Sequence, residues 1–151
     1  MELTIEQALQ QGVTLHKAGK LEEAERFYRA ILQSQPSHPD ANHNLGVLAV
    51  SVNKADVALP LFKTAIEANP KIELYWLSYI DALIKEKQFH SAKQALKQAE
   101  KQGVAAEKLN ILETQLTTIV QVSEPKLPGQ NKSLSLSRSV RNYLNKKGVR
   151  I

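Results

Sequence analysis

Apolar and small residues recur along most of this chain at steps of three and four residues, the spacing that places them on one face of an α-helix. The same residue types also return after 34 positions, in two sets: Ala24, Tyr28, Ile31 and Pro36, then Ala58, Phe62, Ala65 and Pro70. A third, less regular set follows at Ala92, Leu96 and Ala99. A period of this length is typical of helical hairpins that bury their apolar faces only against neighbouring hairpins. The sequence therefore predicts an all-α fold, an α-α solenoid.

The repeat divides a predicted domain of residues 4–121 into three helix-turn-helix units, at residues 5–38, 39–72 and 73–106. Thr4 and Gln7 have the spacing of a capping box, so we expect the first helix to begin directly after Thr4. The second helices of the units are predicted at Leu21–Gln35, Ala55–Asn69 and Phe89–Gln102. One offset between the two helices of each unit favours left-handed backbone, and it is occupied by Gly19, Asn53 and Lys87.

A single amphipathic helix is predicted after the third unit, at residues 105–121. Leu109, Leu112 and Leu116 follow one another at three- and four-residue steps there. Because a finite stack must cover its last apolar face, we expect this helix to be a C-terminal cap. Residues 122–151 lack apolar periodicity, and the sequence predicts a linker followed by a flexible, disordered basic tail.

The formal net charge of +5 is concentrated in this tail. Residues 1–122 hold 13 lysines and arginines against 14 acidic residues, whereas residues 123–151 hold seven against one. Basic and apolar residues alternate near the C-terminus: Arg138, Val140, Arg141, Tyr143, Leu144, Lys146, Lys147 and Arg150. This pattern suits an acidic protein, RNA or an anionic membrane. We do not expect nucleic-acid or membrane binding from the repeats. For the tail such binding is a secondary hypothesis, and a solvated tail without a partner is the simpler expectation.

The composition argues against catalysis. The chain has no cysteine, and its four histidines, at positions 16, 38, 43 and 90, are dispersed. No glycine-rich phosphate loop follows a predicted strand. We therefore expect no enzymatic activity, metal, cofactor or small-molecule substrate. The first residues show no secretory signal and no apolar run is long enough for a membrane span, which favours a cytoplasmic protein.

The repeated residues resemble the tetratricopeptide repeat (TPR). The second unit follows that pattern most closely, with Leu45, Gly46, Ala58, Phe62, Ala65 and Pro70 at the expected offsets. The first unit departs from it at Ala8, which replaces a large residue, and the third at Val104, which replaces a proline. The resemblance covers Ile5 to about Val104. Residues 41–50 and 76–87 further resemble the repeats that precede transferase domains in bacterial glycosyltransferases.

The resemblance implies that the first helices line a concave groove that holds an extended peptide. Carried over by offset, the groove-facing residues are Leu9, Gln10, Val13, Lys17, His43, Asn44, Val47, Leu77, Ser78, Asp81 and Lys85. Asn44 matches an asparagine that hydrogen-bonds the peptide backbone in many family members, although it could also face solvent on an empty surface. Asp81 is expected to pair with Lys85, four residues on.

Some family members grip the C-terminal carboxylates of chaperones with five polar or cationic groove residues. Leu9, Val13, Leu74 and Ser78 occupy four of those positions here, and Asn44 alone matches. Because the charge-assisted hydrogen bonds would be lost, we do not expect that partner class.

Three hypotheses remain open at this stage. The first is a non-catalytic scaffold or adaptor that binds a protein or peptide in the groove. The second is the amino-terminal, substrate-presenting part of a glycosyltransferase whose catalytic domain is absent. The third places the function in the basic tail. The sequence predicts neither the identity of the partner nor the oligomeric state.

Overall fold

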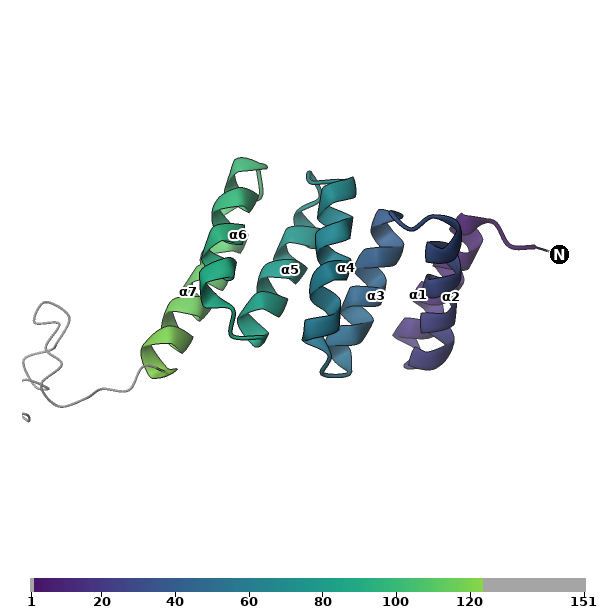
Figure 1. The fold of residues 1–151 in the computed structure, drawn as a ribbon, viewed down its shortest axis with the longest axis horizontal. Helices are drawn as coiled ribbons and strands as arrows, with labels where there is room; N and C mark the ends of the chain where they lie inside the picture. The colour runs from purple at the N-terminus through teal and green to yellow at the C-terminus, as the bar shows by residue number, and fades with distance from the viewer. Residues whose placement is uncertain (1, 124–151) are drawn as a thin grey trace, which may run out of the picture. The chain divides into compact units, whose positions relative to one another are not determined.

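The computed structural model describes residues 2–123, and this part of the chain consists of seven α-helices without a strand. The helices are α1 (Ile5–Lys17), α2 (Leu21–Ser34), α3 (Pro39–Ser51), α4 (Ala55–Ala68), α5 (Glu73–Lys85), α6 (Phe89–Lys101) and α7 (Ala106–Ser123) (Figure 1). The predicted all-α solenoid of three helical hairpins followed by a further helix is confirmed. Apart from residues 122 and 123, the predicted linker and basic tail lie outside the described residues.

The chain divides into two units, Met1–Thr117 and Thr118–Ile151, and the stack of hairpins is the first of them. Within it each first helix packs against the following second helix, as α1 with α2, α3 with α4, and α5 with α6. Consecutive hairpins meet through α2 with α3 and α4 with α5. The first helices α1, α3 and α5 also contact one another in order, so they form one continuous face of this unit.

Local sequence explains where the helices begin. Thr4 and Gln7 form the predicted capping box: the Gln7 N–H donates to Thr4 Oγ1 at 3.1 Å and the Thr4 N–H donates to Gln7 Oε1 at 2.9 Å. Pro39 is the first residue of α3, where a missing N–H removes no helix hydrogen bond. The His38 Nδ1 atom caps the same helix by accepting from the Ala41 N–H at 3.1 Å.

The turn inside each hairpin has the same backbone geometry. Gly19, Asn53 and Lys87 have φ angles of 79°, 63° and 59°, which confirms the predicted left-handed position. The next residue in each turn donates its N–H to the carbonyl five residues earlier, at 2.9 Å from Lys20 to Leu15, 2.8 Å from Lys54 to Ala49 and 2.9 Å from Gln88 to Leu83. These repeated bonds satisfy carbonyls that the end of the first helix leaves unpaired.

Each second helix ends one residue earlier than predicted. In the first two units the reason is the following proline: Gln35 and Asn69 precede Pro36 and Pro70 and have ψ angles of 85° and 86°. The proline ring clashes with a helical residue before it and favours extended backbone there.

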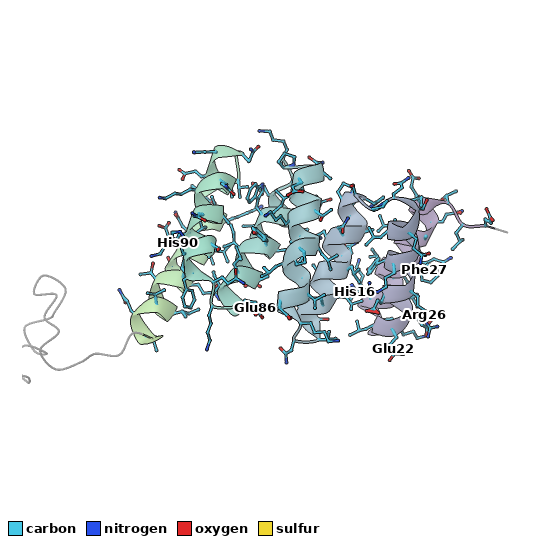
Figure 2. All side chains as sticks on the ribbon, viewed as in Figure 1. His16, Glu22, Arg26, Phe27, Glu86 and His90 are labelled. Carbon is cyan, nitrogen blue, oxygen red and sulfur yellow. The ribbon has the colours of Figure 1, made fainter. Side chains whose placement is uncertain are left out.

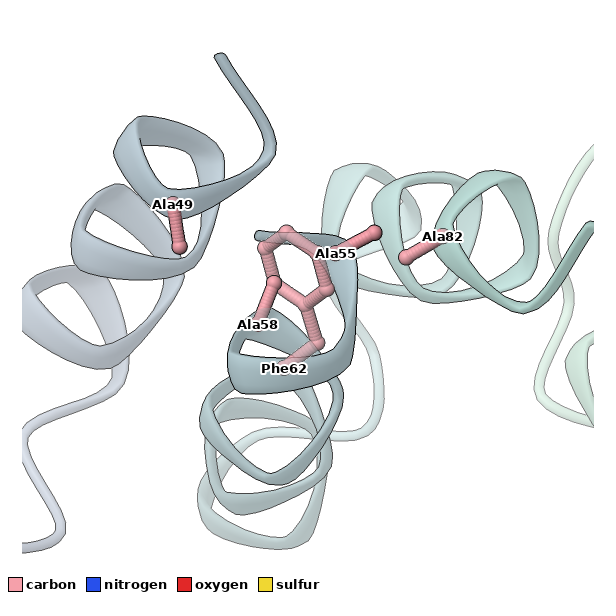
Figure 3. Packing of buried hydrophobic residues seen from close by; sticks show 5 residues of the cluster. All are labelled: Ala49, Ala55, Ala58, Phe62 and Ala82. Carbon is pink, nitrogen blue, oxygen red and sulfur yellow. The ribbon is translucent and has the colours of Figure 1, made fainter. Parts of the chain in front are cut away.

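The core of each of the first two hairpins is an aromatic ring packed on a glycine. A Cβ atom placed on Gly12 would lie 2.7 Å from Tyr28 Cε1, and one placed on Gly46 would overlap the Phe62 ring. Tyr28 and Phe62 are almost fully buried. The Phe62 ring lies with Ala58 between the helices that carry Ala49 and Ala82 (Figure 3), so it joins the second unit to the third.

Two side chains at equivalent offsets close the turns between units. Trp76 Nε1 donates to the Pro70 carbonyl at 2.8 Å, and Asn42 Nδ2 donates to the Pro36 carbonyl at 3.0 Å. Both residues are buried and both lie six positions after the proline that they contact. The short amide of Asn42 therefore reproduces the hydrogen bond of a large indole, an equivalence that residue size does not predict.

The seventh helix buries Leu109, Leu112 and Leu116. Its start is held by Glu73, whose carboxylate accepts from the Ala105 N–H at 3.0 Å and from Lys108 Nζ at 2.6 Å. These interactions hold the pKa of Glu73 below its usual value. In the part of the chain that the structure describes, no helix combines the length and apolar character of a membrane span.

Candidate functional site

The predicted groove residues all lie on α1, α3 and α5, and six of them line one cavity of about 450 Å³. The six are Val13, Lys17, His43, Asn44, Val47 and Ser78. Three residues outside the predicted set, His16, Tyr28 and Leu74, complete the wall. The cavity therefore draws on all three units, because its wall includes side chains from each of the first helices.

The other five predicted residues do not line this cavity. Leu9 packs against the buried cluster of Ala24, Tyr28, Leu45 and Leu48. Gln10 is exposed and lies within 3.5 Å of Thr14 Oγ1, while Leu77 is half-buried. Asp81 and Lys85 form the expected i,i+4 ion pair at 2.8 Å. Both of their side chains already have a partner of opposite charge, which leaves little for a ligand to gain there.

A larger cavity, of about 540 Å³, lies on the first hairpin alone. It is lined from Gly19 to Phe27 around the start of α2, with Glu22, Arg26 and Phe27 along that helix (Figure 2). Its charged side chains have mixed signs, and it draws on one unit only. We therefore place the candidate site in the smaller cavity, where three units converge.

His43 forms the buried back of the cavity. Its side chain is 5% exposed, and its ring centroid lies 5.0 Å from that of Tyr75 and 5.5 Å from that of Phe62. The Nε2 atom lies 2.8 Å from Ser78 Oγ, across the boundary between the second and third units. Burial lowers the pKa of His43, and the Asn44 side chain and the Asp40 carboxylate oppose that shift. The lowered pKa favours the neutral imidazole, which can donate to or accept from Ser78 Oγ.

The His43–Ser78 pair has the spacing of a nucleophile and its base, but its surroundings do not suit catalysis. Ser78 lies in the interior of α5, where backbone N–H groups are used by the hydrogen bonds of the helix and cannot stabilise an oxyanion. The carboxylate of Asp40, which would orient a catalytic imidazole, accepts instead from the Tyr75 hydroxyl. The pair therefore acts as a contact between units. Among residues 2–123 no group of three or more His, Cys, Asp and Glu side chains lies in a metal-binding arrangement.

His16 also lines the cavity, next to Tyr28. Its Nδ1 atom lies 3.2 Å from the Tyr28 hydroxyl, and the two rings meet edge to face with centroids 6.1 Å apart. Partial burial lowers the pKa of His16. The sequence signal that could have found this residue is its position three residues after Val13, on the same helix face.

The mouth of the cavity is apolar. Leu74 is 57% exposed and Val47 is 36% exposed, although both side chains line the cavity. Lys17 is the single side chain in the wall with a permanent charge, and no carboxylate lines it. The surface thus offers apolar contact, polar groups at Asn44 and Ser78, and one cation.

Comparisons with solved structures define the fold class of this chain. The solved structure of the first TPR of Spaghetti (RPAP3), bound to the HSP90 peptide SRMEEVD, is similar with a TM-score of 0.68 and 16% identity, over 76% of this chain and 90% of that one. The Sgt2 TPR domain from Aspergillus fumigatus has a TM-score of 0.71 and 13% identity, over 90% and 93% of the two chains. The TPR2B domain of yeast Sti1, in its pHsp70 complex, gives 0.70 and 18%, over 76% and 97%. At these identities the likeness concerns the fold, and the fold is that of a TPR-type helical repeat.

The sequence itself supports this class in the first hairpin, where residues 8–38 match the family model described as tetratricopeptide repeat. No curated protein matches the chain significantly. The resemblance to the repeats of bacterial glycosyltransferases therefore stays a prediction.

Proposed function

We propose that this protein is a non-catalytic interaction module that binds an extended peptide across α1, α3 and α5. The observation that carries the proposal is the single cavity that these three helices line together. A peptide that crosses them contacts all three units at once. The structural neighbours solved with an HSP90 peptide and in a pHsp70 complex support a protein or peptide partner in general.

Asn44 is the residue proposed to bind the peptide backbone. It lies half-buried in the cavity wall and directly follows His43 in the sequence. The side-chain amide can donate a hydrogen bond to a peptide carbonyl and accept one from a peptide N–H. Because the backbone groups are the same in every residue, such bonds give affinity with little sequence specificity. The wall of the cavity does not show the cationic grip expected for chaperone C-termini, since Lys17 is its only permanently charged side chain.

The test starts from a displayed library of random twelve-residue peptides, selected against the whole protein. Asn44→Ala is expected to lower the affinity for an enriched peptide about three- to ten-fold, which corresponds to the usual net contribution of one hydrogen bond. Gln94→Ala, which removes an exposed amide from α6, is the matched control and should bind like the wild type. Fluorescence anisotropy measures both affinities, and thermal unfolding checks that neither variant loses stability. If the selection enriches no peptide, or if both variants bind equally well, the proposal fails.

A narrower version of the same function is substrate presentation to a glycosyltransferase. Its support is the resemblance of residues 41–50 and 76–87 to repeats that precede such catalytic domains. A transferase domain encoded directly downstream would favour this version, and its absence would leave a free-standing adaptor.

A further inference from the structure

The cavity lined by α1, α3 and α5 has a distinctive combination of apolar surface and charge. Val13, Val47 and Leu74 come from three different units and give it an apolar lining. Two of them, Val47 and Leu74, remain substantially exposed at the mouth. Covering this surface with an apolar ligand group removes it from water and is favourable in proportion to the area buried. At about 450 Å³ the cavity also falls within the range of roughly 300 to 1,000 Å³ that is usual for ligand pockets.

Lys17 is the side chain of the cavity wall that carries a permanent charge. Lys17 forms no ion pair within residues 2–123, in contrast to Lys85, paired with Asp81, and Lys108, paired with Glu73. Glu73 lies next to Leu74 in sequence, but its carboxylate is occupied at the start of α7. The Asp40 carboxylate is likewise engaged by Tyr75. The local charge is therefore positive, at the edge of an apolar cavity.

We infer that the bound peptide inserts one large apolar side chain into the cavity and places an Asp or Glu side chain against Lys17. The acidic residue is two positions from the apolar one, because alternate side chains of an extended peptide share a face. This inference rests on the proposed function, since it names the kind of peptide that the groove accepts. A carboxylate side chain is chosen over a chain terminus because side chains of three successive first helices line the cavity, so an extended peptide that crosses all of them need not end at Lys17. A single lysine also lacks the set of donors that a terminal carboxylate grip needs.

The first experiment is the sequence pattern of the enriched twelve-residue peptides. We expect a Leu, Ile, Met or Phe separated by one residue from an Asp or Glu. Enriched peptides without this pair would overturn the inference while leaving the proposed function intact. A selection that enriches nothing would overturn both.

The second experiment pairs changes in the protein with changes in one enriched peptide. Lys17→Gln is expected to lower the affinity for the acidic peptide about two- to five-fold, because an exposed ion pair is lost. The affinity for the peptide with Gln in place of its acidic residue should not change. Lys20→Gln is the matched control, because Lys20 is exposed and does not line this cavity. Leu74→Ala is expected to weaken every peptide that keeps the apolar residue and to have little effect once that residue is Ala.

Three results would contradict the inference in this second experiment. One is equal loss of the acidic and the Gln peptide in Lys17→Gln. Another concerns a peptide whose C-terminus is amidated. If amidation lowers the affinity as much as replacing the acidic side chain does, Lys17 binds a chain terminus. The third is a homodimer in sedimentation that Leu74→Ala dissociates, which would show that a second copy covers the cavity.

Discussion

The packing of Phe62 on Gly46 gives the sharpest prediction about stability. In Gly46→Ala the new Cβ atom overlaps one carbon of the Phe62 ring and lies 2.7 Å and 3.0 Å from two others. The ring is 1% exposed and enclosed by alanines of three helices, so it has little room to move. Overpacking of this kind costs about 1 to 3 kcal/mol, and a rigid site belongs at the upper end of that range. Alanine recovers about 1 kcal/mol through its better helix propensity.

The expected net loss is about 2 kcal/mol of unfolding free energy, from the difference between these two terms. For a stack of this size it corresponds to a fall of roughly 5 to 10 °C in the midpoint of thermal unfolding. Circular dichroism at 222 nm and urea unfolding measure both quantities. Gly46→Ala combined with Phe62→Leu should lose less than the sum of the two single changes, because the smaller side chain removes the clash.

An increase in the unfolding free energy of Gly46→Ala would refute this reasoning. That result would mean that the ring moves away freely and that helix propensity dominates. Gly19→Ala separates the two effects, since no atom lies within 4 Å of its added Cβ and the φ angle is 79°. Its expected loss, about 1 kcal/mol, comes from left-handed strain alone.

Two further predictions concern His43 and Lys87. The folded pKa of His43 lies below the unfolded value of 6.5, so the unfolded state binds more protons and stability falls as the pH decreases from about 7 to 5. His16 acts in the same direction. His43→Gln should flatten this dependence in urea titrations, and a slope equal to that of the wild type would contradict the assignment. Lys87→Gly should stabilise the protein by up to about 1 kcal/mol, because glycine adopts the φ angle of 59° without strain; a loss of stability would show that the lysine side chain matters more than the backbone.

The sequence predicted the architecture well because the fold is periodic. Helices and turns recur every 34 residues, so their positions in one unit predict those in the next. The left-handed residues at 19, 53 and 87 could therefore be found from this spacing alone. The ends of the second helices were placed one residue too late, since the pattern marks the proline but not the extended residue before it. The pairing of Asp81 with Lys85 also followed from helix spacing.

The cavity was less predictable than the fold. Offsets identify which residues lie on the first helices, but the tilt between successive hairpins decides which of them meet, and a repeat pattern does not encode that tilt. Leu9 and Val13 both pack on the same buried cluster, yet Val13 alone also reaches the cavity. His16 enters the wall although no family offset selected it as a groove residue, and Leu74, which stands at a groove position of the chaperone-binding members, enters the wall although it was left out of the predicted peptide groove.

The structure also separates two kinds of residue in the cavity wall. His43 and Ser78 form a hydrogen bond between the second and third units, and the ring of His43 packs on Tyr75 and Phe62. Changing these residues alters the stability of the stack and the shape of the cavity together, so a loss of binding would not assign them to the ligand. Lys17 and Leu74 reach the same cavity while remaining largely exposed, and neither forms a hydrogen bond or ion pair through its side chain within residues 2–123. Substitutions at these two positions therefore report on the ligand most directly, and their coupling to the peptide sequence is the decisive measurement.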